Sequence, residues 1–369
     1  MTFNLRMLGA LAAIGGFGLL AGCELPPMES RQTGHRGTSM VQIDNPRLVA
    51  AIAAKVAIPP PPYPLEVDPT EERAGTFYQN VKALADIPTS EFNRLMISIT
   101  EWIVPEDVRN DPNSGGGCNY CHNPENLAED SVYTKVVARR MIQMTRNINQ
   151  NWTSHVAATG VTCWTCHRGQ AVPNNVWAAQ AEEQHAYATI GWRNGQNRPA
   201  REIATASLPV DPFSSYLLGA EEIRNASTAS LRSDYARPIQ QTERTYGLMM
   251  HFSSSLGVNC TFCHNTQNFA GWADATPQRV TAWHGIRMVR EANSEYVQTL
   301  AEIFPANRQG PAGDPWKIGC ATCHQGQNKP LGGVSMLPDH PALGPVREIP
   351  APAPVEAAAD GAAATPAPG

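Results

Sequence analysis

Eight of the nine cysteines in this chain of 369 residues occur in four copies of one pattern, Cys-x-x-Cys-His. Two thiols at this spacing form thioether bonds to a porphyrin, and the adjacent histidine supplies a ligand to its iron. The pattern therefore predicts four covalently bound haem c groups. The predicted thioether cysteines and proximal histidines are, in order, Cys118, Cys121 and His122; Cys163, Cys166 and His167; Cys260, Cys263 and His264; and Cys320, Cys323 and His324.

Zinc is the competing interpretation of these motifs, because cysteine and histidine are also its ligands. Four identical motifs in a chain with an export signal favour haem over zinc. No cysteine remains for a disulfide network, since the ninth, Cys23, belongs to the export signal.

The first 22 residues have the features of a secretory signal peptide. Arg6 supplies a positive charge, and the apolar stretch over residues 7–20 is shorter than the roughly 20 residues that span a bilayer. The signal ends in Leu20-Ala21-Gly22-Cys23, which resembles the lipobox of bacterial lipoproteins and predicts a lipid anchor on Cys23. An uncleaved anchor helix is the alternative. Either form places the protein on a membrane outside the cytoplasm, where haem c is attached.

The composition predicts a loop-rich chain whose cofactors form much of its core. Hydrophobic residues make up 42% of the chain, glycine (29) and proline (31) are plentiful, and only 17% of residues are charged. Four porphyrins would supply the apolar surface that such a chain lacks. The formal net charge of −5 and the absence of a basic run argue against nucleic-acid binding.

The residues that follow the motifs indicate an internal duplication. His122 and His264 are both followed by Asn-x-x-Asn, whereas His167 and His324 are both followed by x-Gly-Gln. The order A-B-A′-B′ predicts a two-haem unit that occurs twice, with a pseudo-twofold arrangement. The predicted segments are a Pro-containing, extended and lipid-anchored segment (23–88), the first unit (89–175), a connection (176–234), the second unit (235–332) and a C-terminal segment with a disordered Ala/Pro-rich tail (333–369).

A segment with helical periodicity precedes each motif, so the repeated element is a helix, a turn and a haem motif. Thr89 is the expected N-cap of the first helix, and Ser131 that of the second. The third helix is expected near residues 242–256, and the fourth begins at Thr276 with Pro277 in its first turn. The predicted fold class is mainly α and loop-rich, with almost no strand.

A sixth iron ligand would close each metal and make it an electron relay, and methionine in that position raises the redox potential. Met96 lies 22 positions before Cys118, and Met141 lies 22 positions before Cys163. The shared spacing favours these two methionines as ligands of the first and second haems. It also favours Met141 over Met144.

The third and fourth haems leave alternatives. Aligning the third helix with the Leu-Met pair of the first favours Met249 over Met250. For the fourth haem, the repeat aligns Met288 with the Arg-Met pair of the second helix, whereas His155 lies eight positions before its own neighbouring motif. Spacing alone does not decide between Met288 and His155.

The lipobox, the paired haem motifs, the methionine-bearing helices and the A-B-A′-B′ order together resemble the tetrahaem cytochrome subunit of purple-bacterial photosynthetic reaction centres. The resemblance extends from Cys23 to about residue 345 and is most specific over residues 92–102, 138–147 and 161–169. Residues 104–117 form a longer stretch than is usual in the family.

This resemblance implies a complete set of sixth ligands. The first three haems would be ligated by Met96, Met141 and Met249. His155 would serve the fourth haem opposite His324, which makes Met288 a core residue. Because His155 belongs to the first unit and His324 to the second, this ligation would join the two units.

The resemblance also implies an electron carrier and not an enzyme. The subunit would lie on the periplasmic face of the photosynthetic membrane, against the reaction-centre membrane subunits, and would re-reduce the photo-oxidised bacteriochlorophyll pair. Its electrons would come from a soluble cytochrome c or a high-potential iron–sulfur protein. Two alternatives are a multihaem enzyme such as a nitrite reductase or peroxidase, which needs a five-coordinate haem, and a membrane-tethered carrier for a respiratory oxidase or reductase.

Overall fold

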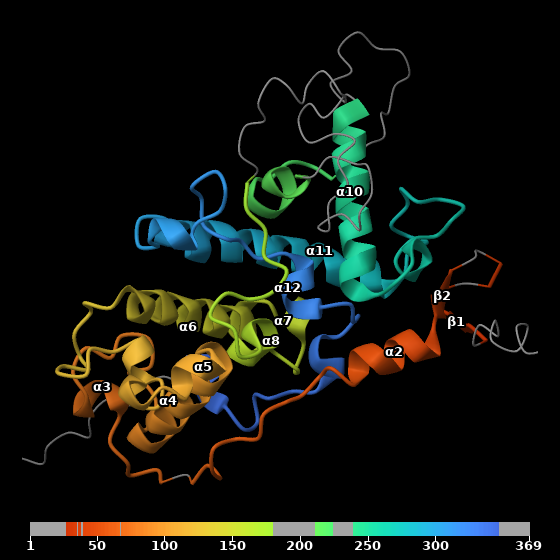
Figure 1. Ribbon diagram of the computed structural model, residues 1–369. Coiled ribbons are helices and arrows are strands. Elements are labelled where there is room, and N and C mark those ends of the chain that lie inside the picture. Colours follow the sequence, from red (N-terminus) through yellow and green to blue (C-terminus); the bar gives the residue numbers. More distant parts are fainter. Residues whose placement is uncertain are drawn as a thin grey trace, which may run out of the picture.

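The computed structural model of the chain describes residues 27–34, 36–37, 40–66, 68–179, 211–223 and 239–346. The signal segment, Cys23, most of the predicted connection over 176–234 and the tail from residue 347 lie outside these ranges. The described part is mainly helical and rich in loops, with a single two-stranded sheet (Figure 1). None of the helices in it is long and apolar enough to cross a membrane.

Three long helices carry the three predicted methionine ligands, the short helix α7 carries His155, and the motifs themselves form short helical turns. The α-helices are α2 (Pro46–Ala53), α3 (Ala74–Phe77), α4 (Thr89–Ile103), α5 (Glu106–Arg109), α6 (Tyr133–Asn151), α7 (Thr153–Val156), α8 (Cys163–His167), α10 (Ile239–Leu256), α11 (Pro277–Glu291) and α12 (Cys320–His324). The strands are β1 (Glu29–Gln32) and β2 (Val41–Asp44). Short 3-10 or π segments are η1 (Pro112–Ser114), η2 (Cys118–Tyr120), η5 (Ser214–Leu218), η6 (Cys260–Phe262), η7 (Ala292–Val297), η8 (Gln298–Leu300), η9 (Ala306–Arg308), η10 (Pro330–Gly333) and η11 (Pro341–Leu343).

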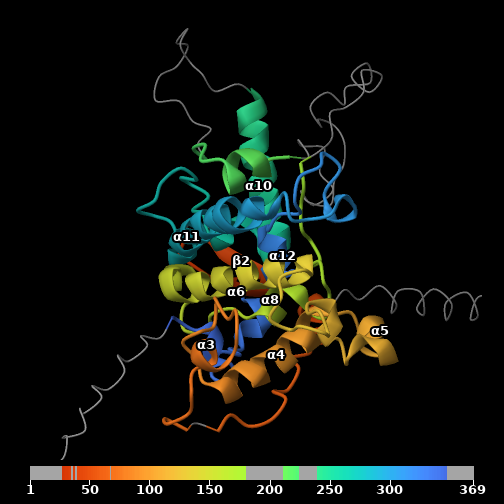
Figure 2. The same ribbon diagram turned by 90° about the vertical axis from the view of Figure 1, so that its left-hand side faces the viewer.

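Helices α6 and α11 lie side by side in the middle of the molecule (Figure 1, Figure 2). Helix α4 packs against α8 on one side of this pair, and α10 packs against α12 on the other. The two short motif helices α8 and α12 contact each other between them. The elements of the two predicted units therefore meet at their second motifs.

The apolar core is divided into two clusters. The first is centred on α4, where Leu95 and Trp102 are almost fully buried, and the second includes Leu248 of α10. Helix α6 contributes to both, with Ile142 in the first cluster and Met144 in the second. Helix α6 therefore links two cores that are each small for a chain of this length.

Two of the predicted helix starts require different caps. Val132 occupies the N-cap of α6, so the assignment of Ser131 is wrong. Helix α4 begins at Thr89, but Thr89 is its first helical residue and not its cap. The Glu71 carboxylate caps α4 from outside, because it accepts from the Ser90 amide at 2.6 Å and from the Thr89 hydroxyl. Helix α11 follows Thr276 as predicted, with Pro277 in its first turn.

The N-terminal segment was predicted to be extended, but it contains β1, β2, α2 and α3. The two strands pair in antiparallel fashion. Asn259 Nδ2 donates to the Val41 carbonyl at 2.7 Å, and Thr33 Oγ1 donates to the Thr261 carbonyl at 3.0 Å. The hairpin therefore holds the turn of the third haem motif.

A buried ion pair connects three distant segments. Arg146 on α6 donates through Nη1 to Asp86 at 2.7 Å, and both side chains are nearly inaccessible. The same guanidinium donates to the carbonyls of Ala83 at 2.8 Å and Gly344 at 3.2 Å. One side chain thus holds α6 to the approach to α4 and to the end of the described chain.

Replacement of Asp86 by alanine should lower the free energy of unfolding by about 3–5 kcal/mol, because Arg146 would stay buried without its carboxylate. Denaturant unfolding of the purified haem-loaded protein measures this loss. Glu221→Ala is the control: its pair with Arg244 spans 3.9 Å and is exposed, so its removal should cost less than about 1 kcal/mol. Equal losses for the two variants would contradict the assignment.

Candidate haem-binding cavity

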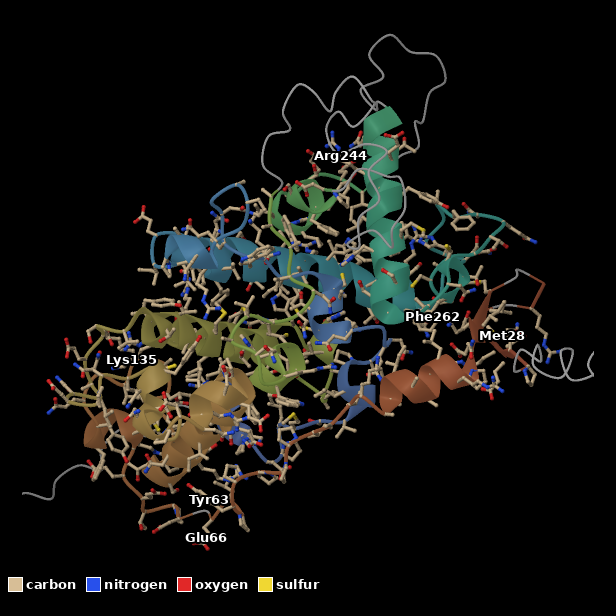
Figure 3. All side chains as sticks on the ribbon, in the orientation of Figure 1. Met28, Tyr63, Glu66, Lys135, Arg244 and Phe262 are labelled. Atoms are coloured by element: carbon tan, nitrogen blue, oxygen red, sulfur yellow. The ribbon has the colours of Figure 1, made fainter. Side chains whose placement is uncertain are left out.

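The motif cysteines, the four proximal histidines and the four predicted sixth ligands all line one continuous cavity of about 2600 Å³ in the described part of the chain. The cavity extends from the first motif, near Lys135, to the third motif at Phe262, and these two residues lie at opposite sides of the molecule (Figure 3). The eight motif cysteines are free thiols. The structure therefore brings together every predicted site residue within the described ranges.

Large apolar side chains line this cavity with much of their surface exposed. Leu127, Tyr246 and Trp272 line it and are each more than half exposed. Exposed apolar surface of this extent marks a binding site, and flat, largely apolar porphyrins fit it. A zinc site would need several ligands gathered around one point. In the ranges that the structure describes, no three His, Cys, Asp or Glu side chains are grouped in that way.

Each proximal histidine donates its Nδ1 proton to a backbone carbonyl. A carbonyl only accepts, so this contact fixes the tautomer and leaves Nε2 free to bind a metal. The acceptor lies five residues after the histidine in the first and third motifs and three residues after it in the second and fourth. The distances are 2.9 Å for His122 to Leu127, 3.0 Å for His264 to Phe269, 2.8 Å for His167 to Gln170 and 2.9 Å for His324 to Gln327.

Burial keeps these groups uncharged. It lowers the pKa of His324 to about 4 and also lowers the pKa of His167, so both imidazoles are neutral at neutral pH. Neutral imidazole is the form that binds a metal. Burial likewise raises the pKa of the Cys163 and Cys320 thiols to about 12.

Helices α4 and α10 present their methionines in the same register. Met96 and Met249 both line the cavity, whereas Met250 does not. The Trp102 carbonyl, six residues after Met96, accepts from the amide two residues beyond His167 at 2.8 Å. The Ser255 carbonyl, six residues after Met249, accepts from the amide two residues beyond His324, also at 2.8 Å. The two methionines therefore occupy matching positions relative to α8 and α12.

A second pair of contacts sets α6, and η7 at the end of α11, in matching positions relative to the second and fourth motifs. Asn149 exchanges hydrogen bonds of 2.8 and 2.9 Å with the backbone of Val161, two residues before the second motif. Asn293 makes the same exchange with Ile318, two residues before the fourth motif, at 2.8 and 2.9 Å. The residue eight positions before Asn149 is Met141.

Counting back the same eight positions from Asn293 gives Gly285 and not Met288. The sequence alignment of Met288 with Met141 is therefore displaced, and Met288 instead matches Met144. Both of these methionines belong to the second core cluster. The error arose because the Arg-Met pair occurs in both helices, whereas the register is set by the two asparagines.

Gly285 leaves the space that His155 fills. A Cβ atom at Gly285 would lie 2.5 Å from the His155 ring. His155 Nδ1 donates to the Thr281 carbonyl at 2.9 Å, and the His155 and His324 ring centroids are 6.0 Å apart. This separation accommodates one metal ion bonded to each ring at about 2 Å. Sequence analysis missed Gly285, although aligning residues 138–149 with residues 282–293 would have found it.

Residues 24–344 match the family described as photosynthetic reaction centre cytochrome C subunit. The chain belongs to this family. It is 46% identical to the photosynthetic reaction center cytochrome c subunit of Rubrivivax gelatinosus, over 97% of this chain and 94% of that protein. The corresponding subunit of Thermochromatium tepidum is 44% identical, over 88% of this chain and 77% of that protein. For Roseobacter denitrificans the identity is 41%, over 85% of each chain.

As a reaction-centre cytochrome c subunit, the chain is an electron carrier that binds haem c covalently, and it is not an enzyme. The interpretation as a multihaem nitrite reductase or peroxidase is thereby excluded. The cavity agrees with the family assignment, because the Cys-x-x-Cys-His turns line one large space that covalently bound haem can occupy.

Gly285→Ala should lower the free energy of unfolding of this cytochrome subunit by about 1–3 kcal/mol, because the added methyl group overpacks the His155 ring. Elsewhere in a helix the same change stabilises by about 0.4–1 kcal/mol. Denaturant unfolding of a double-mutant cycle with His155→Ala provides the test. In the His155→Ala background, Gly285→Ala should be neutral or stabilising, and a loss that persists there would refute this explanation.

Proposed function

We propose that this chain is the tetrahaem subunit that re-reduces the photo-oxidised bacteriochlorophyll pair of a photosynthetic reaction centre. The shared cavity carries the proposal, because four Cys-x-x-Cys-His motifs and four candidate sixth ligands line it without a break. Cofactors attached along one cavity lie close enough together to pass electrons in series. Membership of the reaction-centre cytochrome family supports the bacteriochlorophyll pair as the acceptor.

In this proposal each haem is held by one motif and closed by one residue from another element. Bound haem supplies reversible one-electron chemistry. Met96, Met141 and Met249 would supply the second protein ligand of the first three haems and would raise their potentials. His155 faces His324 at the fourth haem, which consequently has one of the lower potentials because it lacks a thioether ligand.

The recurring contacts support a duplicated two-haem unit with a pseudo-twofold relation. The carbonyls of Trp102 and Ser255 accept from matching glycine amides, and Asn149 and Asn293 bind matching backbone segments. Two kinds of contact recur at the same offsets in both units, as expected if the units share a common ancestor. The two units differ at His155, which belongs to the first unit and contacts the second.

The proposed location is the periplasmic face of the photosynthetic membrane, with Cys23 as the lipid anchor. The partners are the reaction-centre membrane subunits and a soluble donor, either a cytochrome c or a high-potential iron–sulfur protein. Support comes from the lipobox-like sequence before Cys23 and from the relatives, which are named as reaction-centre subunits.

Carbon monoxide binding tests the ligand set. His155→Ala should open the fourth haem, so that one of the four reduced haems binds carbon monoxide, whereas the native protein binds none. Met288→Leu is the matched control, because Met288 also lines the cavity but serves only the core. Binding in Met288→Leu but not in His155→Ala would assign the ligand to Met288 instead. The optical difference spectrum of the dithionite-reduced protein gives the stoichiometry.

Flash spectroscopy of native membranes tests the function. After one actinic flash, haem oxidation should match the re-reduction of the bacteriochlorophyll cation, and deletion of the subunit should abolish this fast phase. Equal recovery of the cation without the subunit would refute the proposal. The chain would then be a membrane-tethered carrier for a respiratory complex.

A further inference from the structure

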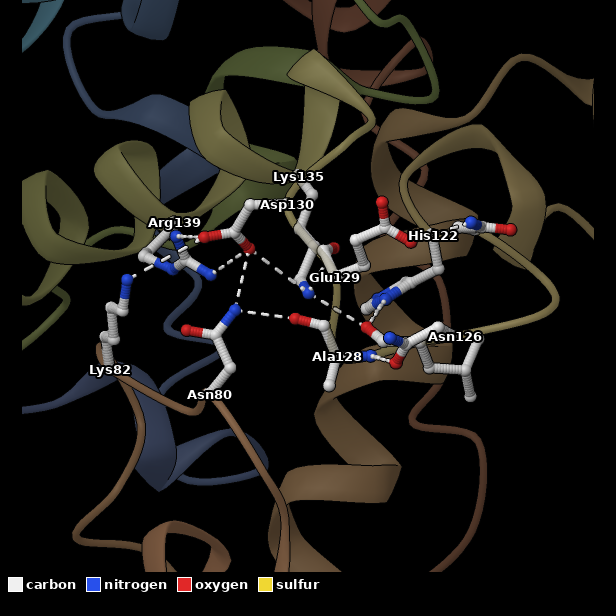
Figure 4. Close-up of polar contacts among 11 residues, drawn as sticks. Asn80, Lys82, His122, Asn126, Ala128, Glu129, Asp130, Lys135 and Arg139 are labelled. Atoms are coloured by element: carbon white, nitrogen blue, oxygen red, sulfur yellow. Dashed lines mark hydrogen bonds and ion pairs between the residues drawn. The ribbon is translucent and has the colours of Figure 1, made fainter.

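The carbonyl that orients the first proximal histidine accepts a second hydrogen bond. Leu127 O accepts from His122 Nδ1 at 2.9 Å and from Lys135 Nζ at 2.8 Å (Figure 4). Lys135 stands in the first turn of α6 and lines the haem-binding cavity. A backbone carbonyl has two lone pairs, so both donors are accommodated at once.

The Lys135 ammonium is held in this position by further contacts. Its Nζ donates to the Glu129 carbonyl at 2.8 Å and lies 3.3 Å from the Asp130 carboxylate. Asp130 is fixed in turn by Arg139 at 2.7 Å and by Asn80 at 2.9 Å. Only 12% of the Lys135 side chain is exposed. These contacts therefore hold the Lys135 cation close to His122.

The third motif lacks this arrangement. Arg279 stands 14 residues before Asn293, as Lys135 stands 14 residues before Asn149. However, Arg279 donates to the carbonyls of Ala270 and Gly271 and packs over an indole ring, so it does not bind the carbonyl that orients His264. That carbonyl, Phe269 O, accepts from His264 Nδ1 at 3.0 Å.

We propose that Lys135 is a positioning residue that raises the midpoint potential of the first haem through the Leu127 carbonyl. A carbonyl that accepts from a metal-bound histidine increases the basicity of that ligand and favours the oxidised metal. The ammonium draws electron density from the same oxygen, which weakens its pull on the His122 proton. His122 then donates less charge to the iron, and the reduced state is favoured. This inference rests on haem attachment at the first motif, as proposed above.

Redox titration of the four haems in the membrane-bound protein tests the inference. Lys135→Met should shift one haem component to a lower midpoint potential and leave the other three unchanged. Met96→His identifies that component, because it changes a ligand of the first haem only. Lys135→Arg should also lower this potential, since it keeps the charge but, like Arg279, should bind other carbonyls.

Lys82→Met is the matched control, because Lys82 carries the same charge, lies 3.7 Å from Asp130 and makes no contact with Leu127 O. It should leave the first haem unchanged. Equal shifts in Lys82→Met and Lys135→Met, an unshifted Lys135→Met, or a native potential in Lys135→Arg would each overturn the inference. In all of these outcomes the titration still counts four haems, so the proposed cofactor content is tested separately.

Discussion

Each haem motif must be held in a fixed position against the rest of the chain, and one backbone device does this for the second and fourth motifs. The residue after each proximal histidine adopts the left-handed conformation, with φ of 47° and 49°. The glycine that follows also has a positive φ, which few other residues adopt without strain. The chain thereby reverses, and the amides of Gly169 and Gly326 reach the carbonyls of Trp102 and Ser255. Helices α4 and α10, which carry Met96 and Met249, are held against the second and fourth motifs by these two hydrogen bonds.

The mainly helical fold was predicted correctly, because its signals are local in the sequence. Thiols and histidine stand together within each motif, and the long helices show their periodicity over several turns. Caps were harder to predict, because the carboxylate of Glu71 that caps α4 comes from outside the helix. Helix α2 was missed although Asn45 accepts from the Leu48 amide and Pro46 stands in its first turn. Its eight residues are too few to give a clear periodic signal.

The candidate sixth ligand of the fourth haem could not be predicted from spacing, because the repeat argument assumes that each helix carries its own ligand. Helix α11 has Gly285 where α6 has Met141, and the ring that fills this space belongs to His155 on α7. His155 comes from a different element, so an alignment of the two helices cannot identify it as a candidate ligand. The resemblance to the reaction-centre cytochromes implied His155 as the ligand, and Gly285 gives a steric reason for the position of its ring. At the fourth motif, the candidate ligand is therefore placed by a tertiary contact and not by its position on the preceding helix.

Matched positions that differ between the two units are important, because different surroundings give chemically identical cofactors different potentials. The contacts that set helix register recur in both units, whereas some of the groups around the motifs differ. Thr162 precedes the second motif and Gly319 the fourth, where His251 Nε2 accepts from the Cys320 amide at 3.1 Å. Lys135 likewise shares the Leu127 carbonyl with His122, whereas Arg279 donates to other carbonyls than the one that orients His264. Where iron ligands repeat, hydrogen bonding, burial and charge are what the protein can still vary, and these are the features in which the two units differ.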